Sequence, residues 1–141
     1  MRNKIVYLLL LVSCISIILQ SCDNEEGLNY KRYYVNGKGL YEKNCQNCHG
    51  SDGTGLGTLY PPLTDNAFLL RNKKKLACII RNGQNEQIVI NQISYQGSMP
   101  GNETLAEIDI AQIIVYITNS FGNKQGFYSS EQTGMDLKEC N

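Results

Sequence analysis

The stretch Cys45-Gln46-Asn47-Cys48-His49 decides how this chain of 141 residues is to be interpreted. Two thiols, separated by two residues, are followed at once by the chain's single histidine. In this arrangement each cysteine can add to a haem vinyl group, while the adjacent imidazole reaches the iron from one side. The motif therefore predicts one haem c, attached covalently through Cys45 and Cys48, with His49 as an iron ligand.

Three other uses of the motif fit the sequence less well than haem attachment. A thioredoxin-like redox pair would follow a strand, and nothing before Cys45 has a strand pattern. A structural zinc site would need four separated ligands, whereas Cys48 and His49 are neighbours and a second close ligand pair is absent from the sequence. A disulfide between the two motif cysteines would be unusually tight. The motif favours haem over each of them.

A second axial ligand is expected if the protein carries electrons, because an iron with both axial positions filled changes little in shape between oxidation states. With no other histidine in the chain, a methionine sulfur is the natural candidate, and a Met/His pair raises the reduction potential. Met1 falls in a targeting signal and Met135 in the C-terminal tail, which leaves Met99 in a loop with Gly and Pro at 97–101. The alternative role for Met99 is filling the core.

The N-terminus has the pattern of an export signal. Arg2 and Lys4 precede an uninterrupted run of apolar and small residues at 5–19. A helix of this length spans about 22 Å, which is less than the bilayer core requires. The pattern is typical of a signal peptide rather than of a spanning anchor.

The residues after this run resemble the lipobox of bacterial lipoproteins, with Leu19 three places before Cys22 and Ser21 immediately before it. Gln20 is an unusual residue for the place between them. The resemblance implies a signal peptide at 1–21, cleavage before Cys22 and lipidation of that cysteine. The alternative is an ordinary secreted protein cleaved nearby. The acidic, polar segment 22–32 is expected to be a flexible tether between the lipid and the domain.

One domain is expected over 33–122, followed by a tail at 123–141 that packs loosely or adds a short turn. The chain carries 13 basic and 13 acidic side chains, and removal of Arg2 and Lys4 with the signal would leave 11 basic ones. This balance gives no indication of nucleic-acid binding.

The sequence predicts helices on both sides of the motif. A first helix is expected over 31–44, and two short helical pieces over 65–81 end at Asn82-Gly83. The last helix is expected to follow a capping box made by Thr104 and Glu107 and to continue to 117. Between them, glycines over 50–57 predict an irregular loop, and the β-branched and aromatic residues at 88–95 predict a small hairpin that turns at Asn91-Gln92.

Over roughly 33–122 the chain resembles class I cytochromes c, particularly small bacterial forms with one haem. The resemblance rests on the haem motif, on Gly37 and Tyr41 before it, and on Tyr116 with Ile113 one turn earlier. It implies an all-α cytochrome c fold, in which three to five helices surround one covalent haem and a small β-hairpin precedes the Met99 loop. In that fold the aromatic residue of the last helix packs on the glycine of the first, where a larger residue would not fit.

The same resemblance assigns a supporting role to Pro61. Its carbonyl would accept a hydrogen bond from the ring nitrogen of His49 that does not face the iron, which fixes the orientation of the ring. Pro62 could accept this hydrogen bond in place of Pro61. The alternative is that both prolines only form a turn.

Two further groups of residues have less specific interpretations. Arg71, Lys73, Lys74 and Lys75 form a basic cluster, which is either a solvated helix face or a docking site for an acidic redox partner. Cys78 lies among apolar residues and is expected to be a buried thiol, with a disulfide to Cys140 as the alternative.

The expected function is single-electron transfer between membrane or periplasmic redox proteins, by a lipid-anchored cytochrome that performs no substrate chemistry itself. Its location would be a bacterial membrane, with the domain facing the periplasm or the cell exterior. Two alternatives are a haem enzyme or gas sensor with an open sixth iron position, and a surface lipoprotein without haem.

Overall fold

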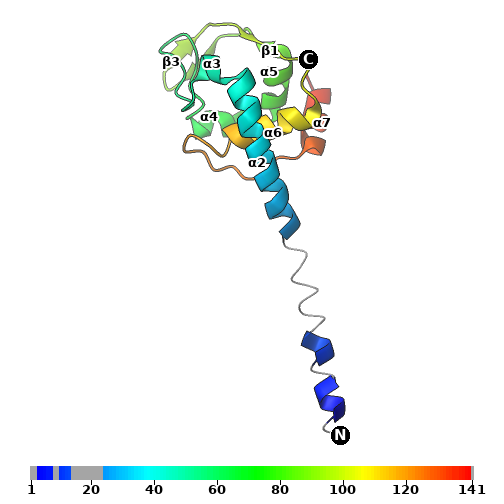
Figure 1. Cartoon of the computed structure of the whole chain (residues 1–141). Helices are drawn as coiled ribbons and strands as arrows, with labels where there is room; N and C mark the ends of the chain where they lie inside the picture. The colour runs from blue at the N-terminus through cyan, green and yellow to red at the C-terminus, as the bar shows by residue number, and fades with distance from the viewer. Residues whose placement is uncertain (1–2, 8–9, 14–23, 141) are drawn as a thin grey trace. The chain divides into compact units, whose positions relative to one another are not determined.

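A computed structural model describes residues 3–7, 10–13 and 24–140 (Figure 1). The chain divides into two units, Met1–Lys31 and Arg32–Asn141. In the first unit the described residues at 3–7 and 10–13 are helical. Within the described residues, no helix is both long enough and apolar enough to cross a membrane. Cys22 and the rest of the predicted lipobox lie outside the described residues.

Helix α2, Asn24–Asn44, begins earlier than the sequence predicts. The expectation of a tether without structure over 22–32 is wrong for its described part, since these residues are helical from Asn24. Glu25 and Glu26 lie in the first turn of α2, where carboxylates interact favourably with the positive end of the helix dipole. No proline interrupts the segment, so acidic composition alone does not prevent the helix.

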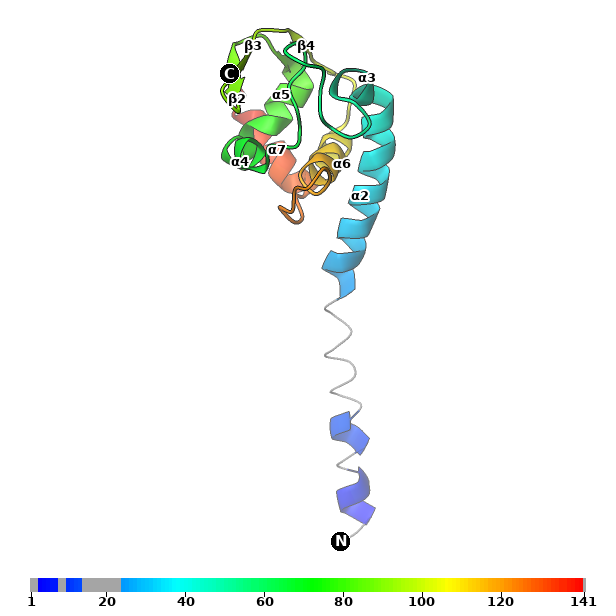
Figure 2. The ribbon, with the colours of Figure 1, turned by 90° about the vertical axis from the view of Figure 1, so that its left-hand side faces the viewer.

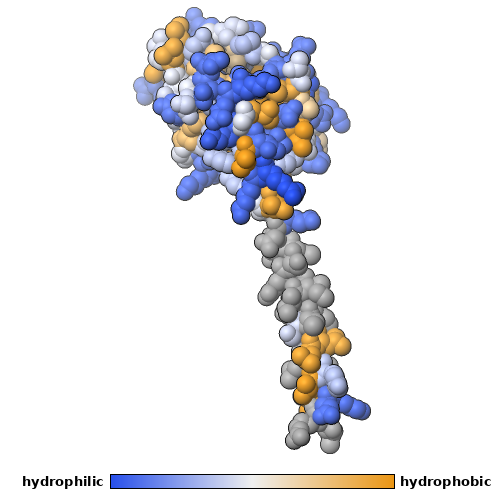
Figure 3. All heavy atoms as spheres, in the orientation of Figure 1, coloured by the Kyte–Doolittle hydropathy of each residue, from blue (hydrophilic) through white to orange (hydrophobic). Residues whose placement is uncertain are grey.

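Helix α6, Glu107–Ile117, is the centre of the second unit. Every residue from Ile110 to Ile117 is buried, as expected for a helix that is apolar on nearly all sides. In Figure 1 α6 crosses α2, and in Figure 2 it lies between α2 and α5, Leu76–Asn82. On the face shown in Figure 3 the exposed apolar side chains of this unit form separate small groups among hydrophilic ones.

The crossing of α2 and α6 depends on Gly37. A Cβ atom at this position would lie 2.0 Å from the backbone oxygen of Gln112 and 3.0 Å from the Cβ of Tyr116. Only glycine allows the two helices to approach this closely. The predicted packing of the Tyr116 helix on Gly37 is confirmed.

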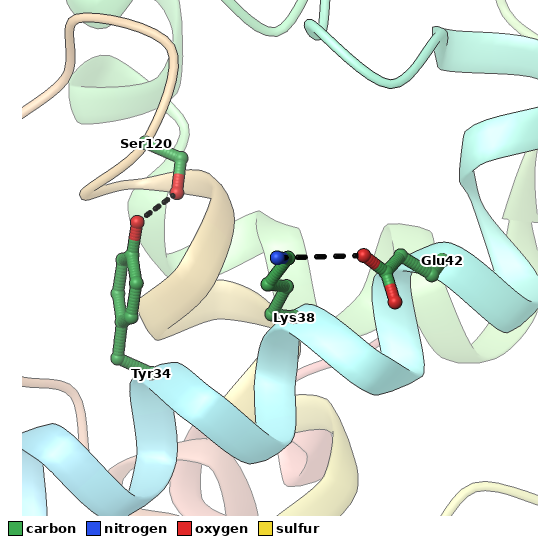
Figure 4. Close-up of polar contacts among 4 residues, drawn as sticks. All are labelled: Tyr34, Lys38, Glu42 and Ser120. Carbon is green, nitrogen blue, oxygen red and sulfur yellow. Dashed lines mark hydrogen bonds and ion pairs between the residues drawn. The ribbon is translucent and has the colours of Figure 1, made fainter.

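An aromatic cluster extends this contact beyond the end of α6. The ring of Tyr116 lies 5.2 Å from that of Tyr41 and 5.6 Å from that of Phe121, measured between centroids. Ser120 donates a hydrogen bond of 3.0 Å to the hydroxyl oxygen of Tyr34 on α2 (Figure 4). One turn further along α2, Lys38 forms an ion pair with Glu42 of the same helix. The cluster therefore ties α2 to the segment that follows α6.

The start of α6 differs from the predicted capping box. The helix begins at Glu107 with Ala106 as its N-cap, and the Asp109 carboxylate accepts the Ala106 N–H at 3.1 Å. The Thr104 hydroxyl instead donates to the side-chain oxygen of Asn102 at 2.7 Å. The predicted Thr104–Glu107 capping box is wrong, because Thr104 lies two residues before the N-cap and takes part in an Asx-type turn at Asn102.

The short elements around 65–82 agree with the sequence. Helix α4, Asn66–Arg71, is capped by Asp65, whose carboxylate accepts the Phe68 N–H at 2.9 Å. A 3₁₀ turn, η2, at Lys73–Lys75 leads into α5. Helix α5 ends at Gly83 with φ of 86°, which confirms the predicted stop.

Two small antiparallel sheets accompany the helices. Strands β2, Ile88–Ile90, and β3, Ile93–Tyr95, form the predicted hairpin, with φ of 50° and 66° at the two turn residues Asn91 and Gln92. Strands β1, Gly83–Gln84, and β4, Met99–Pro100, form a second ladder that the sequence does not predict. The unit therefore has a mainly helical fold with two short sheets, rather than a strictly all-α one.

The C-terminal tail is a packed helix rather than a loose segment. Helix α7, Ser130–Lys138, packs against α5 and α6, and buries Thr133, Gly134 and Asp136. A disulfide joins Cys78 on α5 to Cys140, so the expectation of a free buried thiol at Cys78 is wrong. The sequence does not predict this helix, because the residues that it buries are small and polar and give no apolar periodicity.

Candidate haem site

An apolar cavity opens beside the Cys45–His49 motif. Its empty space is about 950 Å³, counted with the part that is open to solvent. Residues from the motif, the 59–63 segment, α4, α5 and both small sheets line it. The main apolar members of the wall are Leu59, Leu63, Phe68, Leu69, Leu76, Ile79, Ile80, Ile88, Ile90 and Ile117. A wall of this kind suits a large apolar macrocycle.

His49 is at one side of this cavity, as the last residue of helix α3, Gln46–His49. The residue is 8% exposed, and its Nδ1 lies 3.0 Å from the carbonyl oxygen of Pro61. Burial lowers the pKa of His49, while the bond to Pro61 opposes this shift. A neutral ring that donates from Nδ1 keeps a lone pair on Nε2, which is the form that binds a metal. The structure thus contains the hydrogen bond predicted for Pro61.

The loop that carries Pro61 is held close to the motif by Gly55. A Cβ on Gly55 would lie 2.2 Å from the carbonyl oxygen of Tyr60 and 2.8 Å from that of Pro61, and φ of this glycine is +71°. Its N–H also donates to the His49 carbonyl at 2.9 Å. Glycine is therefore needed here for the loop to fold back over the histidine.

The two motif cysteines are both free thiols and half-buried. Cys48 lines the cavity, and Cys45 is the N-cap of α3 next to it. Burial, and next the proximity of Cys48, raises the pKa of Cys45 to about 11. A redox-active dithiol needs a lowered pKa, so this environment does not favour the thioredoxin-like alternative. Within the described part of the chain, no group of three or more Cys, His, Asp or Glu residues is arranged to hold a metal ion.

Met99 lies in β4 and lines the same cavity as His49. Met135 is 53% exposed on α7 and is not part of this wall. The fold therefore brings Met99 and the motif together and keeps Met135 away from them. Three polar residues near the cavity have no motif in the sequence that predicts their place there: Gln84, Glu86 and Ser98.

The basic cluster is separate from this cavity. Arg71, Lys73 and Lys74 line a groove shared with Tyr128 and other residues of the tail. Lys73 donates to the Gln125 carbonyl at 3.3 Å, and its Nζ lies 5.7 Å from the Tyr128 ring centroid. Part of the cluster thus holds the tail in place, which neither sequence-based interpretation includes.

Comparisons with known proteins agree with this geometry. Residues 34–117 match the model of a family described as cytochrome C oxidase, cbb3-type, subunit III. The chain is also similar to two proteins named alcohol dehydrogenase (quinone), cytochrome c subunit, from Gluconacetobacter polyoxogenes and Komagataeibacter europaeus, with 33% identity over 95 residues in each case. The match covers 64% of this chain but only 19% of each relative. Since the family match includes the motif, the cavity helices and Met99, the chain belongs to this family of c-type cytochromes.

Proposed function

We propose that the chain carries one haem c, bound through Cys45 and Cys48 with His49 and Met99 as axial ligands, and that it transfers single electrons between redox proteins. The observation that carries the proposal is that Cys48, His49 and Met99 all line one apolar cavity. The sequence contains the attachment motif once, which supports a single haem.

The residues of the cavity fit the group. The bound haem would supply a reversible one-electron change at its iron. The Pro61 carbonyl holds the His49 ring with its Nε2 lone pair free to bind iron, at a Nδ1–O distance of 3.0 Å. Met99 supplies a soft sulfur ligand, which stabilises the reduced state and raises the potential. The apolar wall from α4 and α5 limits the access of water.

The donor and acceptor in this proposal are redox enzymes at a membrane or in the periplasm. The two relatives are cytochrome c subunits of alcohol dehydrogenase complexes, which supports a role as the electron-transfer component of an oxidoreductase system. We further propose that the protein is exported and anchored through a lipid on Cys22, on the basis of the lipobox-like residues before it. Mass spectrometry of the mature N-terminus tests the anchor: an unmodified Cys22, or cleavage at another residue, would contradict it.

Expression with a cytochrome maturation system and a Met99→Ala substitution test the haem assignment. The wild type is expected to hold covalent haem with a low-spin spectrum in both oxidation states, and Met99→Ala is expected to become high-spin with a lower reduction potential. Met135→Ala is the matched control, because it removes a methionine outside the cavity. A high-spin wild type that binds cyanide rapidly would indicate an enzyme or sensor instead, and absence of covalent haem would reject the proposal altogether.

A further inference from the structure

Met99 is held by a short ladder at the end of α5. In this ladder β4 pairs with β1, so that Gln84 is opposite Met99 and Gly83 is opposite Pro100. Strand β1 follows directly after α5, a helix that contributes Leu76, Ile79 and Ile80 to the cavity wall. The backbone of the proposed sixth ligand is thus fixed to an element that shapes the haem cavity.

We infer that Gly83 and Gly101 are positioning residues, which let the 98–102 segment lie close enough to α5 for the Met99 sulfur to reach the iron. This inference rests on the proposed function, because it concerns the ligand assigned there. Neither glycine contributes a side chain to the cavity. Their role is to leave space at the point where two backbones meet.

The backbone of Gly101 lies close against the backbone at the end of α5, with no space for a side chain between them. A Cβ at this position would lie 2.5 Å from the carbonyl carbon of Asn82, 2.6 Å from the oxygen of Arg81 and 2.8 Å from the nitrogen of Gly83. All three are backbone atoms, which cannot rotate away as the end of a side chain can. Gly101 does not have a positive φ, so space is the only property for which glycine is needed.

Gly83 faces the Met99 segment from the other side. Its Cβ would lie 2.4 Å from the Met99 carbonyl oxygen and 2.8 Å from the nitrogen of Gly101, and its φ is +86°. A methyl group on either glycine would therefore force β1 and β4 apart. Since Pro100 and Gly101 are exposed, the segment can move outward into solvent without disturbing the buried α6. The expected result is displacement of Met99 in a protein that still folds.

Hydrogen bonds fix the same segment at both ends. The Ser98 hydroxyl donates to the Asn85 side-chain oxygen at 2.5 Å. The Asn102 N–H donates to the Ile80 carbonyl at 3.0 Å, and its side chain donates to that of Asn44 at 3.3 Å. Asn44 is the last residue of α2, immediately before the haem motif. The segment is thus tied both to the cavity wall and to the motif side of the site.

Gly101→Ala in the haem-loaded protein tests the inference, with Gly39→Ala as its control. Among the described residues, no atom lies within 4 Å of a Cβ built on Gly39, and its φ is not positive, so it receives the same methyl group without a clash. We expect the ratio of sulfur-ligated to unligated ferric haem to fall about tenfold in Gly101→Ala. The reduction potential should fall and cyanide should bind faster, with covalent haem content and helical circular dichroism unchanged. The control should match the wild type.

A second pair of variants distinguishes the effect of a steric clash from the effect of placing alanine at a positive φ. Gly83→Ala and Gly126→Ala both place alanine at a positive φ, +86° and +77°, but only the first meets nearby atoms. We expect a loss of Met99 ligation in Gly83→Ala alone.

A third pair applies if the alanine variants do not accumulate. Ser98→Ala and Ser94→Ala each remove one exposed hydrogen bond of 2.5 Å, but only Ser98 adjoins Met99. Ser98→Ala should bind cyanide several-fold faster than Ser94→Ala. Equal rates in this pair, or unchanged ligation in both glycine variants, would overturn the inference. A wild type without sulfur ligation would instead reject the proposed function.

Discussion

Two helix contacts hold the second unit together, and they do so in different ways. Helices α2 and α6 meet backbone to backbone at Gly37, with aromatic rings packed around the crossing. The second contact holds α7 in place, through a disulfide to α5 and through buried polar groups. One of these is a hydrogen bond from Tyr128, in the segment before α7, to Asp136 on α7. The first contact excludes any larger side chain, whereas the second tolerates a small polar face because a covalent bond and hydrogen bonds compensate for it.

The two contacts also support different parts of the candidate site. Helix α2 leads directly into the haem motif, so the α2–α6 crossing places Cys45, Cys48 and His49. Helix α5 contributes to the wall of the cavity and leads into the ladder with Met99. The comparison predicts that damage at the first contact affects folding as a whole, while damage at the second lowers stability with less effect on the motif.

The largest effect is expected for Gly37→Ala. The added methyl group would meet the backbone oxygen of Gln112 at 2.0 Å, and the two helices must separate to accept it. We expect the free energy of unfolding to fall by about 4 kcal/mol, at the upper end for an overpacked contact. Denaturant unfolding of the haem-loaded protein measures the change. Gly39→Ala, two residues along the same helix, should raise stability by about 0.7 kcal/mol through better helix propensity. Equal stability of the two variants would show that the crossing is not tight.

The next largest effect concerns the disulfide. In a Cys78→Ala/Cys140→Ala double variant, the unfolded chain is no longer constrained over a separation of 62 residues. We expect a loss of about 3 kcal/mol in the free energy of unfolding, with the sulfur-ligated haem spectrum retained. Dithiothreitol should lower the stability of the wild type to that of the double variant and leave the variant unchanged, with haem kept reduced in all samples. A wild type insensitive to the reductant would contradict a structural bridge.

The α2–α6 contact could be predicted from the sequence, and the α5–α7 contact could not. The resemblance to class I cytochromes c implies that Tyr116 packs on Gly37. The apolar run of α6 is a local signal that predicts a buried helix by itself. The hairpin with Asn91-Gln92 and the stop at Gly83 are likewise set by nearby residues. The same holds for the haem motif, in which all the information lies within five residues.

The parts that escaped prediction depend on distant partners. Helix α7 buries Thr133, Gly134 and Asp136, so its sequence lacks an apolar stripe. The β1–β4 ladder joins pairs of residues far apart in sequence and leaves no periodic signal. The disulfide between Cys78 and Cys140 is only the alternative in the sequence-based interpretation, because a separation of 62 residues does not by itself identify a partner. Long-range geometry therefore decided these elements, whereas local chemistry decided the motif.

The smallest effect is expected at the buried hydrogen bond of the second contact. Tyr128 is 6% exposed and donates to Asp136, whose other oxygen accepts from Gln132 at 2.9 Å. Tyr128→Phe leaves the Asp136 carboxylate with one hydrogen-bond partner fewer. We therefore expect the free energy of unfolding to fall by about 1.5 kcal/mol at neutral pH. Tyr33→Phe is the control, because its hydroxyl reaches Ser130 on the same helix through a longer, 3.3 Å bond. The free energy of unfolding should fall less in Tyr33→Phe than in Tyr128→Phe.

The pH dependence of stability tests the same bond in another way. Burial, and next the bond to Asp136, raises the pKa of Tyr128 above its ordinary value of 10.0. The unfolded chain then loses this proton at a lower pH than the folded protein. The stabilisation is therefore complete below about pH 10 and is lost as the pH rises further. Tyr128→Phe removes this group, so its free energy of unfolding should decline less steeply than that of the wild type between about pH 10 and 11. Parallel curves would mean that the Tyr128–Asp136 bond does not hold α7, and that the disulfide alone distinguishes the second contact from the first.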